Sequence, residues 1–246
     1  MSYQSRFPNL VKRHKIVIGL DFGTTYSGRM PSGEVRIRNW PDAGVSYVTS
    51  DKSGLENIVI IDKWPNYGPS EPKAPTRIAY ASENLDKIDE DQWGFSASSG
   101  LKSYSWTKLL LDKDASPSSY DDPRLQDLFG SGLMRLPPNK SAGQVCRDYL
   151  KGLYAYTVER IEKHIGRDVF NASPVECWIT VPAIWLPKAQ RATKEAAWKA
   201  GFGSRPRDTI HIIPEPEAAA LAALKPYTRP DALDAIQVSL CNCMNH

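Results

Sequence analysis

A short apolar run that ends on a carboxylate is the segment of this chain best suited to chemistry. Residues 16–28 read IVIGLDFGTTYSG, so Asp21 follows a predicted buried strand and the chain turns at Gly23. Glycine lets a backbone approach an anion closely, and the amides and hydroxyls that follow can donate to phosphate oxygens. The pattern predicts a phosphate-holding hairpin with a magnesium nucleotide as its ligand. The alternative interpretation is a strand end whose carboxylate only caps a turn.

A second α/β unit is predicted in the C-terminal half, where two stretches read CWITVPAIWLPKAQRATKEAAWKAGF and IHIIPEPEAAALAAL. The run VECWITVPA is a buried strand by its apolar residues. A proline near the start and Gly201 just past the end favour a helix over 187–200. A strand over 209–213 follows, and Pro216 can open a helix over 217–224. The order strand, helix, strand, helix is typical of an α/β unit.

Taken in order, the DFGTTYS turn, the VPA strand end, the QRATKEAAWKAG helix and the EPEAAALA segment resemble the seventy-kilodalton heat-shock protein family of the actin-like ATPase superfamily. The chain looks closest to divergent, fungal-type members. The resemblance covers most of 15–225. It implies an α/β fold with a ribonuclease H-like first lobe, formed by 15–43 and 144–246. A smaller α+β subdomain, 44–143, would be inserted into it after a polar tail, 1–14.

The same resemblance implies ATP and Mg as ligands of the first hairpin. Asp21 would accept hydrogen bonds from the waters of the metal ion and would thus contact it only through water. Gly23 would let the backbone approach, and Thr24, Thr25 and Tyr26 would cradle the β- and γ-phosphates.

Two further catalytic residues follow from the resemblance. Glu215 matches a glutamate near the metal and the attacking water, although a carboxylate at a helix N-terminus is also favoured by the helix dipole alone. Lys108, in SYSWTKLLLD, matches a lysine that touches the γ-phosphate, with Lys102 as the alternate; an exposed lysine without a role is the competing interpretation. Phosphoryl transfer to water needs such charges, rather than a protein nucleophile.

The sequence also departs from the family pattern. The family continues into a second phosphate hairpin, Asp-x-Gly-Gly-Gly-Thr, but this sequence contains no Gly-Gly pair and reads DALDAIQVSLCNCMNH where that hairpin is expected. We therefore expect a truncated relative that lacks the second lobe, binds nucleotide weakly and turns over little. Pro31 follows the first hairpin closely, so the second strand is either very short or has lost residues.

The middle of the chain is rich in Pro, Ser, Asp and aromatic residues and gives weaker patterns. Strands are expected over 57–62 and 77–81, whereas the end of 101–112 is compatible with helix or strand. Apolar residues then recur at helical spacing, which predicts a long amphipathic helix over 144–165 with Gly166 as its stop.

Composition is that of an ordinary globular interior, with 41% hydrophobic and 24% charged residues. No apolar run approaches the length of a membrane span, and the N-terminus lacks the apolar core of a signal peptide, so we expect a cytoplasmic protein with no membrane partner. Lys and Arg exceed Asp and Glu by 31 − 28 = 3, too little to indicate a nucleic-acid partner. Four cysteines give no disulfide framework in a chain of this size.

Three alternatives to a nucleotide-binding fragment stay open. A sugar or glycerol kinase of the same superfamily shares the first hairpin, although the VPA and QRATK segments favour the chaperone branch. A catalytically inactive interaction module, with a protein partner or client, would explain the missing second hairpin. A chain that exposes an apolar face meant for an absent lobe would instead self-associate. Complete relatives would be ATP hydrolases, and this activity is expected to be impaired here.

Overall fold

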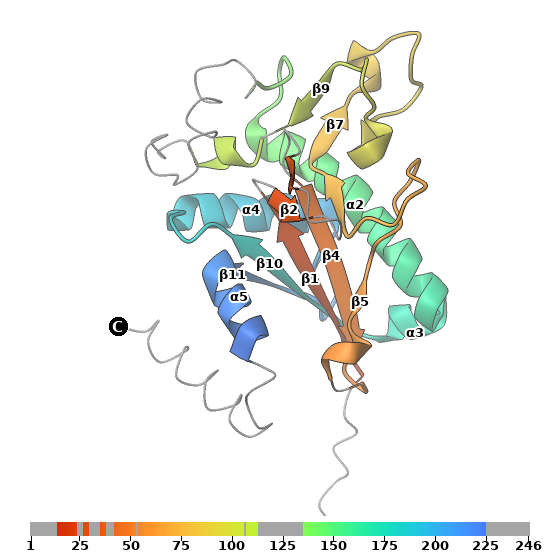
Figure 1. The fold of residues 1–246 in the computed structure, drawn as a ribbon, viewed down its shortest axis with the longest axis vertical. Helices are drawn as coiled ribbons and strands as arrows, with labels where there is room; N and C mark the ends of the chain where they lie inside the picture. Colours follow the sequence, from red (N-terminus) through yellow and green to blue (C-terminus); the bar gives the residue numbers. More distant parts are fainter. Residues whose placement is uncertain are drawn as a thin grey trace, which may run out of the picture.

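A mixed β-sheet lies at the centre of the fold (Figure 1). The computed structural model describes residues 14–23, 27–29, 35–37, 42–52, 54–105, 107–112 and 135–224. The strand order is β11-β10-β1-β4-β5, and β6 also pairs with β4. Neighbours β1, β10 and β11 are parallel, whereas β4 is antiparallel to β1, β5 and β6. The strands are β1 Ile16–Phe22, β4 Asp42–Thr49, β5 Val59–Ile60, β6 Lys73–Pro75, β10 Val175–Val181 and β11 Thr209–Pro214.

Period-two alternation decides which face of this sheet is buried. In β1 and β10 alternate residues are almost fully buried, and they belong to one hydrophobic cluster with residues of α2 (Ala142–Ile165) and α4 (Pro187–Ala200). Phe22 of β1, for example, stacks on Tyr149 of α2 with ring centroids 5.9 Å apart. Helices α2 and α4 therefore cover one face, and α5 (Glu215–Leu224) lies on the other side of the sheet (Figure 1).

Local sequence explains where α2 begins and ends. The hydroxyl of Ser141 accepts from the amide of Gln144, whose side chain accepts in turn from the amide of Ser141, so the two residues form a capping box. The chain leaves the helix at Gly166, where φ is +91°, a conformation that glycine adopts without strain. The predicted stop is confirmed, and the cap moves the start two residues ahead of the predicted 144–165.

Smaller elements surround the sheet. The three-stranded sheet β8-β7-β9 and the hairpin β2-β3 have short strands, and a short helix, α3, joins α2 to β10. The bounds are β2 Ser27–Arg29, β3 Val35–Ile37, β7 Arg77–Ala79, β8 Gln92–Trp93, β9 Ser103–Ser105 and α3 Arg167–Ala172. Single 3-10 turns form at Leu55–Asn57, Ala81–Glu83, Gly94–Ser96 and Leu109–Leu111.

Most predicted elements are present with altered bounds. The predicted α/β class, the helix over 187–200 and the strand that ends in VPA are confirmed. The strand expected over 57–62 is only two residues long, that over 77–81 only three, and 101–112 divides into a strand and a 3-10 turn. Helix α5 begins at Glu215 rather than 217, because β11 runs into it without an intervening loop.

The topology also bears on the predicted second strand and on the predicted boundary at residue 43. The second strand is present as β2, which has three residues within the described part of the chain, and this length does not decide between the two alternatives. The predicted boundary at 43 between core and inserted subdomain falls inside β4, which pairs with β1 from Ala43 to Thr49. The main sheet thus takes up strands from the first part of 44–143. Among the described residues, no helix has the length and apolar character that crossing a membrane would require.

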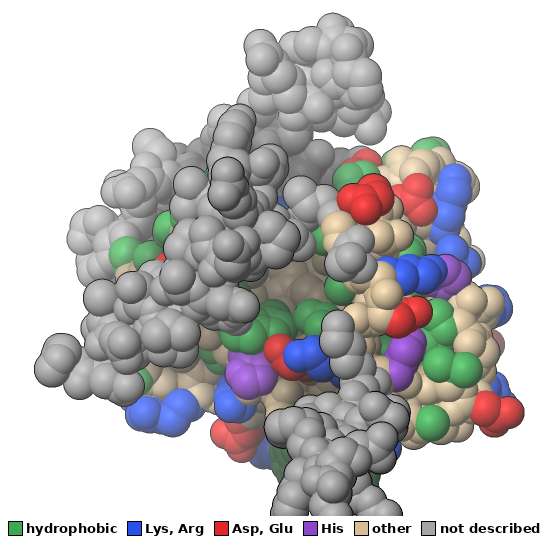
Figure 2. Space-filling view, turned by 90° about the horizontal axis from the view of Figure 1, so that it is seen from below, with side chains coloured by type: hydrophobic (Ala, Val, Ile, Leu, Met, Phe, Trp, Pro, Cys, Tyr) green, Lys and Arg blue, Asp and Glu red, His purple; other side chains and the backbone are tan. Residues whose placement is uncertain are grey.

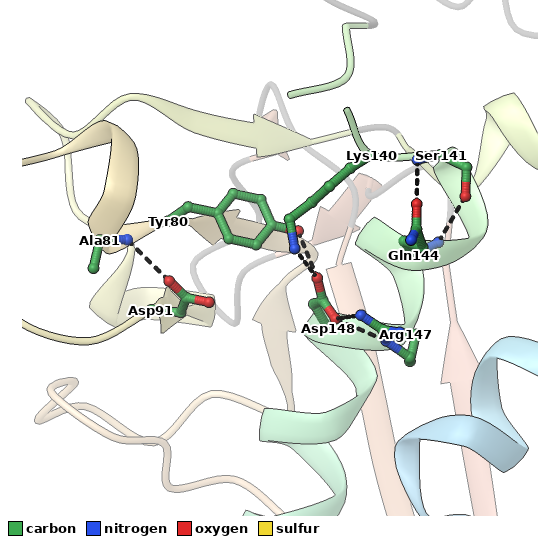
Figure 3. A network of polar contacts seen from close by, with 8 residues as sticks. All are labelled: Tyr80, Ala81, Asp91, Lys140, Ser141, Gln144, Arg147 and Asp148. Carbon is green, nitrogen blue, oxygen red and sulfur yellow. Dashed lines mark hydrogen bonds and ion pairs between the residues drawn. The ribbon is translucent and has the colours of Figure 1, made fainter. Parts of the chain in front are cut away.

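A polar network joins the three-stranded sheet to the first turns of α2 (Figure 3). The carboxylate of Asp148 accepts from the Tyr80 hydroxyl at 3.1 Å and the Lys140 ammonium at 2.8 Å, and from the Arg147 guanidinium at 2.8 and 2.6 Å. The Lys140 ammonium also lies 4.3 Å from the centre of the Tyr80 ring. Burial by itself raises the pKa of Asp148, but the hydrogen bonds from Lys140 and Arg147 outweigh it and hold the pKa below its ordinary value.

We expect Asp148→Ala to lower the free energy of unfolding at pH 7 by about 1–3 kcal/mol, because a mostly buried carboxylate with three partners is lost. Since the pKa of Asp148 is lower in the folded state, its contribution is present above the unfolded pKa of about 4 and disappears as the pH falls through the folded value. Urea unfolding at pH 7 and in acid would measure both effects.

The matched control is Glu159→Ala, which removes an exposed carboxylate that pairs with Lys163 on the same helix. It should cost less than about 0.5 kcal/mol. A loss for Asp148→Ala that is equally large in acid would contradict the assignment to its charge.

Candidate functional site

Asp21 lies near the end of β1 on the sheet face opposite α2, with its side chain 39% exposed. Its Oδ1 accepts from the hydroxyl of Thr180 at 2.9 Å, and its Oδ2 lies 2.6 Å from the ammonium of Lys73. Leu20 is opposite Ile179 in the parallel ladder, so the residues that follow, Asp21 and Thr180, project together onto the other face. Both carboxylate oxygens thus have donors from the protein.

Lys73 reaches Asp21 across an intervening strand. Asp21 pairs with Gly44 of β4, and Gly44 pairs with Lys73 of β6, so the three residues form one cross-strand row. A Cβ at Gly44 would lie 3.4 Å from Cγ and 3.7 Å from Cε of Lys73. The lysine stem therefore lies over the bare backbone of Gly44, and its ammonium meets the carboxylate beyond.

Lys108 places a buried ammonium on the other side of the β1 end. The side chain is 1% exposed, and its Nζ donates to the carbonyl oxygen of Phe22 and lies 3.5 Å from that of Thr180. The rings of Phe22 and Trp185 have centroids 5.2 and 5.1 Å from the ammonium, within cation–π range. Burial lowers the pKa of Lys108 to about 8, although Glu215 and Asp21 act in the opposite direction.

Glu215 is the first residue of α5 and lies beside this lysine. Its Oε1 is 3.9 Å from Nζ of Lys108; this oxygen is buried and has no hydrogen-bond partner within the described part of the chain. Burial raises the pKa of Glu215, whereas Lys108 lowers it. Oε1 of Glu215 can therefore accept a hydrogen bond from a further donor.

The structure therefore brings together the three predicted catalytic residues, although Asp21, Lys108 and Glu215 lie far apart in the sequence. The alternate, Lys102, pairs instead with Glu83 at 2.5 Å beside the three-stranded sheet. Asp21 contacts Thr180 and Lys73 on other strands, and Lys108 is buried rather than exposed.

The predicted phosphate turn is only partly described. Gly23 is buried, and its amide donates to the carbonyl of Asp42 at 3.0 Å, so this amide extends the β1–β4 ladder. The predicted phosphate contacts Thr24, Thr25 and Tyr26 lie outside the described residues.

A groove of about 750 Å³ runs from Asp21 over the sheet face opposite α2 to α5. Asp21, Lys73 and Thr180 lie at one end, and Glu176 and Trp178 lie farther back along β10. The remaining lining residues are mostly apolar and include Val17, Val45, Ile60, Ile213, Ala218 and Leu221. Figure 2 shows hydrophobic side chains along the edge of a hollow near the centre of the view from below. The arrangement is one of charged groups at the mouth of an apolar groove.

Two residues of this site are missing from the sequence-based prediction. Thr180 carries a usable signal, because VECWITV alternates buried and half-buried residues and so assigns Thr180 to the same face as Glu176. Lys73 carries none, since it lies between prolines in a strand of three residues whose pairing depends on residues far away in the sequence.

Comparisons with known proteins give distant relatives. No family model matches the chain. Heat shock 70 kDa protein 12A of Mus musculus is 26% identical over 228 residues, which cover 85% of this chain and 28% of that protein. The Homo sapiens proteins 12A and 12B are 25% and 24% identical, with the same coverage. The chain thus has distant homology to these heat shock 70 kDa proteins over most of its length, and spans about a quarter of theirs.

The buried ammonium predicts a specific pH dependence of stability. The pKa of Lys108 is about 8 in the folded chain and about 10.4 in the unfolded one, so between these values the unfolded state binds more protons and stability rises with pH. Relative to Lys108→Met, the wild type should gain up to about 3 kcal/mol between pH 8 and 10.4.

Urea unfolding across this range would measure the difference between the two proteins. Lys163→Met, which alters an exposed lysine of α2, is the control and should run parallel to the wild type. If the free energy of unfolding of Lys108→Met changed with pH in the same way as that of the wild type, the lowered pKa of Lys108 would be contradicted.

Proposed function

We propose that this chain is a heat shock 70-like, actin-like ATPase-type nucleotide-binding module, which binds the triphosphate of ATP beside the ends of β1 and β10. The observation that carries the proposal is the convergence of Asp21, Lys108 and Glu215 at one point. Chance rarely brings three residues predicted from separate motifs into electrostatic contact around the end of one strand. The homology to heat shock 70 kDa proteins 12A and 12B supports the same ligand class.

In this proposal each charged residue has a separate role. Lys108 supplies a positive charge whose strength comes from its low-dielectric surroundings and from a position fixed by two carbonyls and two rings. Glu215, with its open acceptor, would orient a water molecule toward the terminal phosphate. The turn 23–26 would supply backbone and hydroxyl donors to the phosphates.

Magnesium fits this set of donors less well than the resemblance implies. A metal-bound water would have to share Oδ1 of Asp21 with the Thr180 hydroxyl or Oδ2 with the Lys73 ammonium, and that ammonium repels a divalent ion. Mg²⁺ also requires near-octahedral oxygen ligation, usually through one or two carboxylates. The proposal therefore rests on the protein's own cations, and no step is assigned to the metal.

Turnover is expected to be slow for the 246 residues on their own. They contain no Gly-Gly pair and hence no second glycine-rich phosphate hairpin of the family type. Losing the donors of such a hairpin weakens binding tenfold for every 1.4 kcal/mol. The division into a first-lobe core, 15–43 and 144–246, and an inserted subdomain, 44–143, is part of this proposal, with β4 as a strand of the core sheet.

An interaction module without nucleotide binding is the second candidate, and one observation favours it. Each oxygen of the Asp21 carboxylate already accepts from one donor of the protein, and the groove beside it is lined by Val17, Ile213 and Leu221. Such a module would bind a protein partner equally well with and without ATP.

Calorimetric titration of ATP into the purified chain would test the proposal. Saturable binding is expected, and Lys108→Met should weaken it by at least about tenfold, because a desolvated cation at the phosphates is removed. Lys163→Met, far from the groove on the exposed side of α2, is the matched control and should bind like the wild type. No binding by a folded wild-type chain would contradict the proposal and favour the interaction module.

A further inference from the structure

The ammonium of Lys73 lies beside the carboxylate of Asp21, where the resemblance implies a hydrated magnesium ion. Its ammonium lies 2.6 Å from Oδ2, the contact length of a charge-assisted hydrogen bond, and its side chain is 29% exposed at the edge of the groove. Glu215 also interacts with the charge of Lys73, and Lys108 with those of Asp21 and Glu215. Two ammonium groups and two carboxylates thus form one cluster that is neutral as it stands.

The pairing of three strands places Lys73 and Asp21 in contact. The row Asp21, Gly44, Lys73 crosses three neighbouring strands, and at about 4.8 Å per strand the outer two backbones lie roughly 10 Å apart. A side chain at Gly44 would meet the lysine stem. The absence of one there gives the lysine a straight path to the carboxylate.

An ammonium and a magnesium ion neutralise polyphosphate in different ways. An ammonium offers up to three N–H donors from a fixed point, so it can bridge a carboxylate and phosphate oxygens. A divalent ion placed at the same carboxylate would be repelled by the ammonium at short range.

We propose that Lys73 supplies the positive charge for which the predicted magnesium ion is otherwise required, so that the chain binds metal-free ATP. This inference rests on the proposed function and specifies the form of its ligand. Lys73 and Lys108 would approach the phosphates from β6 and from the turn at Leu109–Leu111, and Asp21 would hold the Lys73 ammonium in place.

The test compares ATP binding to the 246-residue chain by calorimetry in excess EDTA and in excess magnesium. For the wild type, binding in EDTA should be at least as tight as in magnesium, because in excess magnesium the ATP is present as its magnesium complex, whose metal ion the Lys73 ammonium repels. Lys73→Met should weaken binding in EDTA by at least about tenfold, and added magnesium should recover part of the loss. Lys73→Arg keeps the charge and should retain binding in EDTA.

The matched control is Lys15→Met. Lys15 forms the same kind of pair, with Nζ 2.7 Å from Oε2 of Glu176, but it precedes β1 and so lies at the opposite end of the sheet. This variant should bind ATP like the wild type in both buffers.

The outcomes separate the two proposals. Wild-type binding that requires magnesium would overturn the role of Lys73 and leave the proposed function intact. Metal-independent binding that survives in Lys73→Met would likewise overturn it. No binding in either buffer would contradict the proposed function and this inference together. If Lys73→Met does not fold, a wild type that binds ATP only with magnesium still overturns the proposal, and Lys73→Arg, which keeps the charge, still has to bind ATP in EDTA.

Discussion

The pairing of β1 with β10 and β4 is the constraint on which the rest of the structure depends. Alternate residues of β1 are buried against α2, and this apolar set fixes the register, because a slip of one residue would turn it to the open face. The same alternation sends Asp21 and Thr180 to the groove side by side, with Gly44 opposite Asp21. The polar site is therefore positioned by the hydrophobic core behind it.

Through Lys108, the strand pairing also positions a segment outside the sheet, the 3-10 turn that follows this lysine. A buried ammonium is costly unless polar groups replace its water, and here two backbone carbonyls from β1 and β10, two aromatic rings and Glu215 do so. The contact ties the 3-10 turn Leu109–Leu111 to the strand ends and the start of α5.

How much the sequence predicts depends on the range of the interactions involved. Helix α2 is readable because periodicity, the Ser141 cap and Gly166 are all local signals. The motif residues Asp21, Lys108 and Glu215 are found by resemblance, but their convergence needs the sheet topology. Lys73 escapes both approaches, since its strand is short and ends on a proline, and its partner is two strands away. The local pattern thus predicts elements, whereas the electrostatics of the site arise from pairing between distant segments.

The Lys73–Asp21 pair also bears on what the site is built for. Both side chains are partly exposed, and a surface ion pair of this kind contributes little to stability, typically under about 1 kcal/mol. A lysine that merely stabilised the sheet would gain as much from a neighbour on the adjacent strand. Instead the side chain spans a glycine to reach Asp21 at the groove mouth. The pair therefore affects the charge around Asp21 more than it affects the stability of the fold. Substitution of Lys73 should accordingly change whether a ligand needs a metal cation in order to bind.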